Sequence, residues 1–164
     1  LGLIMKQEIL YFKTAEPRVR FDLNSISGLV PIIPTYAGMK TELLDMLDLD
    51  KIDGLIIEAF GAGNLPKEVA GKLADMIADG LPVALVSRCF NGIAEPVYAY
   101  EGGGVQLHQA GIFFVKELNA QKARIKLLIA LNAELKGQEL RDYMEGWEKK
   151  SLFIFFKSKI AKVA

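Results

Sequence analysis

The chain has 164 residues, which suits a single domain, and its 51% hydrophobic and 24% charged residues are typical of a globular protein. Its 20 basic and 20 acidic side chains cancel to zero net charge, so no long-range attraction to nucleic acid or to anionic lipid is expected. Nucleic acid is therefore disfavoured as a partner, and little charge repulsion opposes self-association.

Residues 1–27 have the mixed character of a connector between domains. A short strand is predicted at 9–12, and residues 18–23 alternate polar and apolar side chains as an exposed edge strand does. Residues 1–10 lack the basic and apolar regions of a signal peptide. Because the sequence does not begin with Met, we interpret the chain as a piece of a longer protein.

A regular alternation of strands and helices is predicted from Gly28 onward. It starts with an apolar run at 29–34, a helix at 41–49 and a buried strand at 53–60. A glycine turn then leads into a helix that begins at Pro66 and ends at Gly80, before a strand at 82–87. A weaker strand at 111–115, a helix at 120–131 and one or two turns at 139–145 follow.

Apolar strands separated by an amphipathic helix indicate βαβ units and a parallel sheet. We predict a three-layer α/β domain over residues 28–146, Rossmann-like or flavodoxin-like, with helices on both faces of a small parallel sheet. The tail, 147–164, is basic and aromatic and fits this pattern poorly. It is a membrane-surface segment, a terminal element that docks on the domain, or a stretch foreign to the natural protein; membrane contact is the least favoured. No apolar run approaches the ~20 residues that span a bilayer.

Ligands of open α/β sheets bind beyond the carboxyl ends of the strands, which points to loops 60–65 and 88–104. Gly61-x-Gly63-Asn64 joins a strand to a helix, where backbone amides can hold an anionic group. A dinucleotide fingerprint needs a third glycine where Pro66 stands, so a turn that requires glycine torsions is the favoured interpretation. Asn64 either caps the helix or contacts a ligand.

The second loop and its surroundings offer weaker candidates. The glycines at 102–104 permit a close backbone approach or a flexible turn, and Glu95 is a loop carboxylate with no evident partner. The single cysteine, Cys89, excludes an internal disulfide and is interpreted as a small residue at a strand end. The single histidine, His108, has no candidate nucleophile and is expected on a helix surface. One Cys and one His form no zinc or iron–sulfur ligand set, so no metal site is predicted.

Three short motifs follow one another along the chain: Gly61-x-Gly63-Asn64-x-Pro66, Ser87-Arg88-x-x-x-Gly92 and Gln121-Lys122-Ala123-Arg124. In this order and spacing, residues 25–146 resemble the C-terminal domain of bacterial L-asparaginases, and most of all the cytoplasmic type. The resemblance implies hydrolysis of L-asparagine to L-aspartate and ammonia by a threonine nucleophile, without a metal or an organic cofactor.

That nucleophile belongs to an N-terminal T-G-G-T-I motif, which this sequence lacks, so no catalytic residue is assigned here. The resemblance implies a missing N-terminal catalytic domain as partner, a homodimer or tetramer, and a cytoplasmic location. It also implies that Asn64, presented by Gly63, supports the substrate across a subunit interface. Glu95 and Glu101 are weaker candidates for a similar role.

Two other functions stay open. The chain is alternatively a stand-alone α/β module that binds a small polar ligand, or part of the amidase subunit of a tRNA-dependent amidotransferase. If a whole domain is missing, its apolar interface is exposed and the chain is expected to self-associate.

Overall fold

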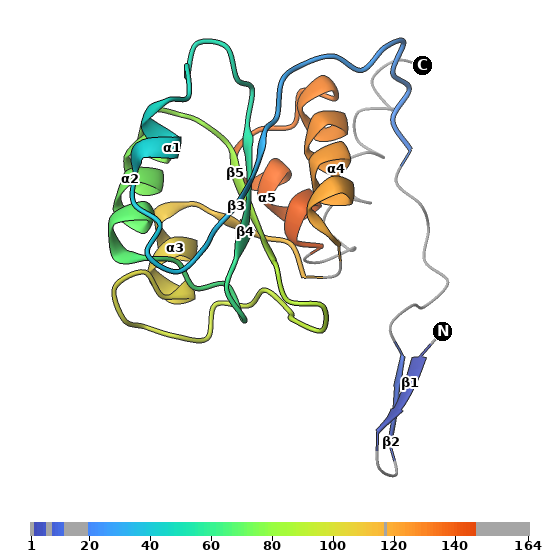
Figure 1. Ribbon diagram of the computed structural model, residues 1–164. Helices are drawn as coiled ribbons and strands as arrows, with labels where there is room; N and C mark the ends of the chain where they lie inside the picture. The colour runs from blue at the N-terminus through green and yellow to red at the C-terminus, as the bar shows by residue number, and fades with distance from the viewer. Residues whose placement is uncertain (1, 6–7, 12–19, 117, 147–164) are drawn as a thin grey trace.

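The computed structural model describes residues 2–5, 8–11, 20–116 and 118–146. At its centre is a parallel sheet of four strands in the order β3, β4, β5, β6 (Figure 1). The strands are β3 (Ile32–Pro34), β4 (Leu55–Ala59), β5 (Val83–Ser87) and β6 (Phe113–Phe114). The helices are α1 (Glu42–Asp45), α2 (Lys67–Ala78), α3 (Gly104–Ala110), α4 (Ala120–Asn132) and α5 (Gly137–Glu145).

The sheet separates two hydrophobic cores because successive residues of a strand point to opposite faces. Ile57 and Leu85 face the core formed with α1, α2 and α3, whereas Ile56 and Ala84 face the core formed with α4 and α5. Right-handed crossovers between consecutive neighbouring strands place their connecting helices on one face. The predicted three-layer α/β architecture is confirmed, and Figure 1 shows the sheet between its two helical layers.

The longer helices follow their sequence patterns. Helix α2 buries Val69, Leu73 and Met76 on one face, and Gly80 follows its C-cap with φ +99, as predicted for a glycine at a helix end. Helix α4 begins after Asn119, whose side chain accepts a hydrogen bond of 3.0 Å from the backbone N–H of Lys122.

Two local predictions differ from the structure, and the limits of one helix were not predicted. The helix predicted at 41–49 is limited to α1: the apolar side chains of Leu43 and Met46 are exposed, so little packing favours further turns, although Leu47 packs against the core. The edge strand predicted at 18–23 is absent from its described part, 20–23. Helix α3 carries His108 as expected, but its limits were not predicted, because it begins within the glycines.

The amino-terminal region contains a hairpin of β1 (Gly2–Met5) and β2 (Glu8–Tyr11), and β2 confirms the strand predicted at 9–12. The tail, 147–164, lies outside the described residues. The boundaries of the connector, the domain and the tail remain predictions. Among the described residues, no helix has the length and apolar character needed to cross a bilayer.

Candidate functional site

The two loops predicted to carry function meet at the carboxyl edge of the sheet. The backbone N–H of Leu65 donates to the carbonyl of Gly102 at 3.0 Å, and that of Glu95 donates to the carbonyl of Ala62 at 2.8 Å. The turn after β4 and the long loop after β5 therefore form one continuous surface.

Glycine torsions shape the turn that carries Asn64. Its ends are joined by two backbone hydrogen bonds between Phe60 and Asn64, of 3.0 and 2.9 Å. Gly63 has φ +110, and a Cβ atom there would lie 2.7 Å from Cε1 of Phe114 and 3.1 Å from the side chain of Leu85. Residue 63 must therefore be glycine both for its torsion and for the space, which confirms the interpretation of a glycine-dependent turn.

The side-chain oxygen of Asn64 is unsatisfied. Its Oδ1 atom is buried and has no hydrogen-bond partner among the described residues. The N-cap of α2 is Pro66, without a side-chain capping bond, so the interpretation of Asn64 as the cap is wrong. A buried acceptor without a donor destabilises a fold by about 1–3 kcal/mol, so the structure of this chain alone gives no stability reason for asparagine here.

The glycines of the second loop allow a close approach of backbone to backbone. Gly102 has φ +82, and a Cβ atom there would collide with the carbonyl of Leu65. A Cβ atom on Gly103 would lie 2.5 Å from the carbonyl oxygen of Tyr98. Close approach, rather than a flexible turn, is the observed role of these glycines.

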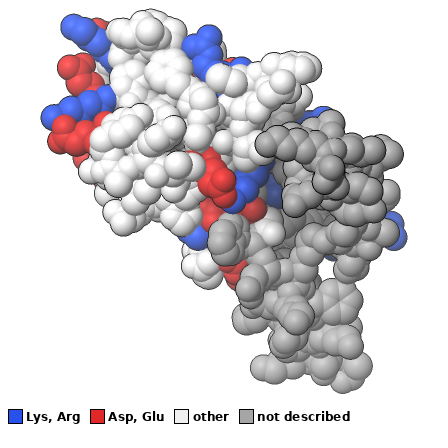
Figure 2. Space-filling view, turned by 90° about the horizontal axis from the view of Figure 1, so that it is seen from below, with Lys and Arg blue, Asp and Glu red and all other residues white. Residues whose placement is uncertain are grey.

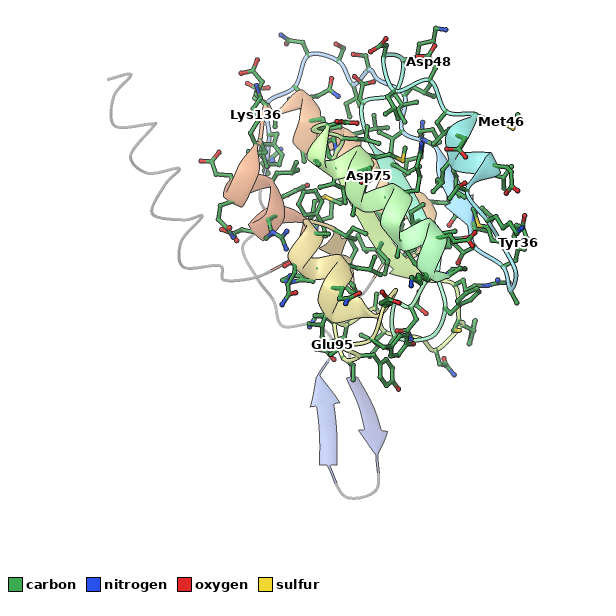
Figure 3. The ribbon with its side chains drawn as sticks, turned by 90° about the vertical axis from the view of Figure 1, so that its left-hand side faces the viewer. Tyr36, Met46, Asp48, Asp75, Glu95 and Lys136 are labelled. Carbon is green, nitrogen blue, oxygen red and sulfur yellow. The ribbon has the colours of Figure 1, made fainter. Side chains whose placement is uncertain are left out.

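Both loop carboxylates have lysine partners. Glu95 pairs with Lys116 at 2.7 Å, and Glu101 pairs with Lys67 at 2.6 Å. The pair with Glu101 raises the pKa of Lys67, chiefly through their hydrogen bond. Figure 3 shows Glu95 at the lower end of the domain, below α3. The carboxylates are 53% and 64% exposed, so these ion pairs contribute little to stability and remain open to a ligand.

Two residues considered as candidates for chemistry have ordinary surroundings. Cys89 is a free, exposed thiol after β5. His108 lies on α3, with its Nε2 atom 3.1 Å from Oε1 of Glu145 and 2.9 Å from Arg141. These contacts join α3 to α5 and include no nucleophile, as expected for a histidine on a helix surface.

The carboxyl edge exposes apolar and aromatic side chains. They include Tyr36, Phe90, Tyr98 and Tyr100, with Phe90 fully exposed. Figure 2 views the molecule from this side, and the described part of the surface is largely uncharged, with charges at the upper left corner, along the upper edge and near the centre. Such a surface is typical of contact with another protein surface.

Comparison with known proteins identifies the family. A family model for the glutaminase/asparaginase C-terminal domain matches residues 29–144. The chain is 39% identical over 134 residues to a probable L-asparaginase of Deinococcus radiodurans, which covers 82% of this chain and 40% of that protein. It is 26% identical over 135 residues to a glutamyl-tRNA(Gln) amidotransferase subunit of Pyrococcus abyssi, covering 82% of this chain and 30% of that protein.

The fold also matches a solved structure, that of a probable cytoplasmic L-asparaginase from Campylobacter jejuni. The TM-score is 0.66 with 22% sequence identity, over 88% of this chain and 46% of that chain. This likeness concerns the fold alone, and the chain spans less than half the length of each of these three proteins. The resemblance seen in the sequence is confirmed: the chain belongs to the glutaminase/asparaginase C-terminal domain family.

Proposed function

We propose that this chain serves as the C-terminal domain of an L-asparaginase, which hydrolyses L-asparagine to L-aspartate and ammonia. In this proposal the nucleophilic threonine belongs to an N-terminal catalytic domain, and the present chain supplies subunit contacts and a supporting residue. The family match and the relative from Deinococcus radiodurans support the reaction class. The complete enzyme would be a cytoplasmic homodimer or tetramer without a metal or organic cofactor, as the resemblance implies.

The unsatisfied side-chain oxygen of Asn64 is the observation that carries the proposed supporting role. A buried carbonyl-type oxygen without a donor is complementary to a group rich in N–H donors, and the α-ammonium of an amino-acid substrate is such a group. The oxygen is covered in this chain, so the side chain must turn toward the substrate when the catalytic domain is present. Glu95 and Glu101, which remain partly exposed, are secondary candidates for the same ammonium group.

A kinetic comparison tests this role. The chain is joined to the N-terminal portion of the Deinococcus radiodurans relative, and asparagine-dependent ammonia release is followed for the unchanged protein and for Asn64→Ala. Loss of a hydrogen bond to a charged group is expected to lower kcat/KM on the order of 10- to 100-fold. Asn91→Ala is the matched control, because Asn91 is an exposed asparagine of the neighbouring loop. Equal kcat/KM for Asn64→Ala and the unchanged protein would refute the role.

The amidase part of a tRNA-dependent amidotransferase is the second candidate. It is favoured by relatives described as glutamyl-tRNA(Gln) amidotransferase subunits, at 26% identity in Pyrococcus abyssi and 29% in Pyrococcus furiosus. The probable L-asparaginase is more similar, at 39%, and this difference decides the order of the two proposals. Ammonia release that requires a partner subunit and glutamylated tRNA would reverse that order.

A further inference from the structure

The carboxyl end of β5 holds the neighbouring turn through the hydroxyl of Ser87. This hydroxyl donates to the carbonyl of Gly61 at 2.6 Å and accepts from the backbone N–H of Cys89 at 3.2 Å. A serine hydroxyl has a single donor, and here that donor is directed at the turn. A Cβ atom on Gly92 would collide with Ser87, so the loop backbone lies directly against the hydroxyl.

The next residue, Arg88, contacts the ends of β3 and β4, the two strands on the side of β5 away from β6. Its backbone N–H donates to the carbonyl of Ala59 at 2.9 Å, and its guanidinium donates to the carbonyl of Thr35, just after β3. The guanidinium carbon also lies 5.8 Å from the ring centroid of Phe60, within reach of a cation–π interaction. Arg88 thus ties the ends of β3 and β4 to β5, next to the turn.

Side-chain packing does not support the Gly61 end of the turn. A Cβ atom on Gly61 would meet nothing within 4 Å, whereas one on Gly63 would strike Phe114 and Leu85. Gly61, which is exposed and has φ +47, therefore has no packing where a Cβ atom would lie, and its orientation depends on hydrogen bonds. The bond from Ser87 is the one that reaches its carbonyl from outside the turn.

We infer that Ser87 and Arg88 are positioning residues that hold the turn in the orientation from which Asn64 acts. That they position Asn64 for a substrate rests on the proposed function, but the contacts that fix the turn are a property of this chain. Neither residue needs to touch the substrate. Ser87 acts through Gly61, and Arg88 acts through Phe60 and the end of β4.

Amide hydrogen exchange, measured by NMR on the 164-residue chain, tests the hold directly. The N–H groups of Gly63 and Asn64, both bonded to the carbonyl of Phe60, report on the turn. Ser87→Ala is expected to raise their exchange rates about fivefold relative to core amides, the effect of losing one ordinary hydrogen bond. Asn119→Ala is the matched control, because it also removes one side-chain hydrogen bond, of 3.0 Å from the N–H of Lys122, but at the start of α4 instead of at the turn.

Two results would overturn the inference: unchanged exchange at Gly63 and Asn64 in Ser87→Ala, or an equal increase at these two amides in Asn119→Ala. If Ser87→Ala does not fold, Arg88→Gln carries the test at an exposed position, with the same amides expected to exchange about fivefold faster. Unchanged rates in Arg88→Gln would overturn it equally.

A double-mutant cycle in the joined enzyme tests whether the hold serves Asn64. Ser87→Ala is expected to raise KM about fivefold in the unchanged background and to have no effect in the Asn64→Ala background. Equal effects in both backgrounds would overturn positioning of Asn64 while leaving the proposed reaction intact. If the joined enzyme releases no ammonia, the proposed function fails, and the exchange experiment still tests whether Ser87 and Arg88 fix the turn.

Discussion

Removing the side chain of Asn64 should not destabilise this chain, unlike most substitutions of a residue in a well-ordered turn. Its Oδ1 atom is buried without a donor among the described residues, and such an atom destabilises the fold by about 1–3 kcal/mol. Asn64→Ala removes that penalty and also loses the packing of a small amide group, about 1 kcal/mol. The expected net change in the free energy of unfolding is therefore an increase of about 0–2 kcal/mol.

Asn132 provides the opposite case within the same domain. Its side-chain amide accepts from the N–H of Ser27 at 3.1 Å and donates to the carbonyls of Ser27 and Leu128, both at 2.8 Å. Asn132→Ala removes these three bonds and should lower the free energy of unfolding by about 1–3 kcal/mol. The two substitutions are chemically identical, so any difference between them reflects whether the amide is satisfied.

Equilibrium unfolding in urea measures both variants, provided that the slopes of free energy against urea stay equal. A helix cap at Asn64 would instead predict a loss of about 0.5–2 kcal/mol on truncation to alanine. A loss larger than about 1 kcal/mol for Asn64→Ala would refute the reasoning, because the amide would then have a stabilising partner.

Three further predictions concern the scaffold around this edge. Gly63→Ala should lower the free energy of unfolding by about 2–5 kcal/mol, because the new side chain meets a strained torsion and a clash with Phe114. Gly71→Ala is the control in α2: its Cβ atom would meet nothing within 4 Å, so it should raise the free energy of unfolding by about 0.5–1 kcal/mol. Similar values for the two variants would contradict the geometry. Glu145→Gln should lower the free energy of unfolding by about 1.5–3 kcal/mol, because a carboxylate that is only 5% exposed loses its charge-assisted hydrogen bonds. An unchanged midpoint of urea unfolding would refute this prediction. Burial raises the pKa of the phenol of Tyr143 above its usual 10.0, so the folded state binds that proton more tightly than the unfolded state does. The stability that the neutral phenol contributes is therefore present below pH 10 and is lost as the pH rises through the raised pKa. Tyr143→Phe should reduce the fall in stability above pH 10, and an identical pH dependence in both proteins would count against it.

Local patterns predicted the parts of the fold that depend on local physics. Helix α2 was recognisable because its apolar side chains recur on one face and Gly80 ends it. The Gly63 turn was recognisable because glycine is the residue that tolerates such torsions. Helix α1 was overestimated because periodicity does not reveal whether a neighbouring element covers Leu43 and Met46, and Figure 3 shows Met46 at the outer side of the domain.

The contacts that define the site could not be predicted from the sequence, because they join residues from separate strands. The bond from Ser87 to Gly61 depends on the register between β4 and β5, in which Ala59 lies opposite Ser87. The pairing of Glu95 with Lys116 likewise depends on where β6 lies in the sheet. Topology did predict that the two loops share one edge, since parallel strands end on the same side.

The proposal that this domain supports a separate catalytic domain is tested most directly by ammonia release from asparagine. The measurement compares the 164-residue chain alone with the same chain joined to the N-terminal portion of the Deinococcus radiodurans relative, each first shown to be folded by circular dichroism. No activity in the chain alone and asparagine-dependent release in the joined protein is the predicted result. Release by the chain alone, at a rate comparable to that of the joined protein, would place the catalytic groups within these residues and contradict the account.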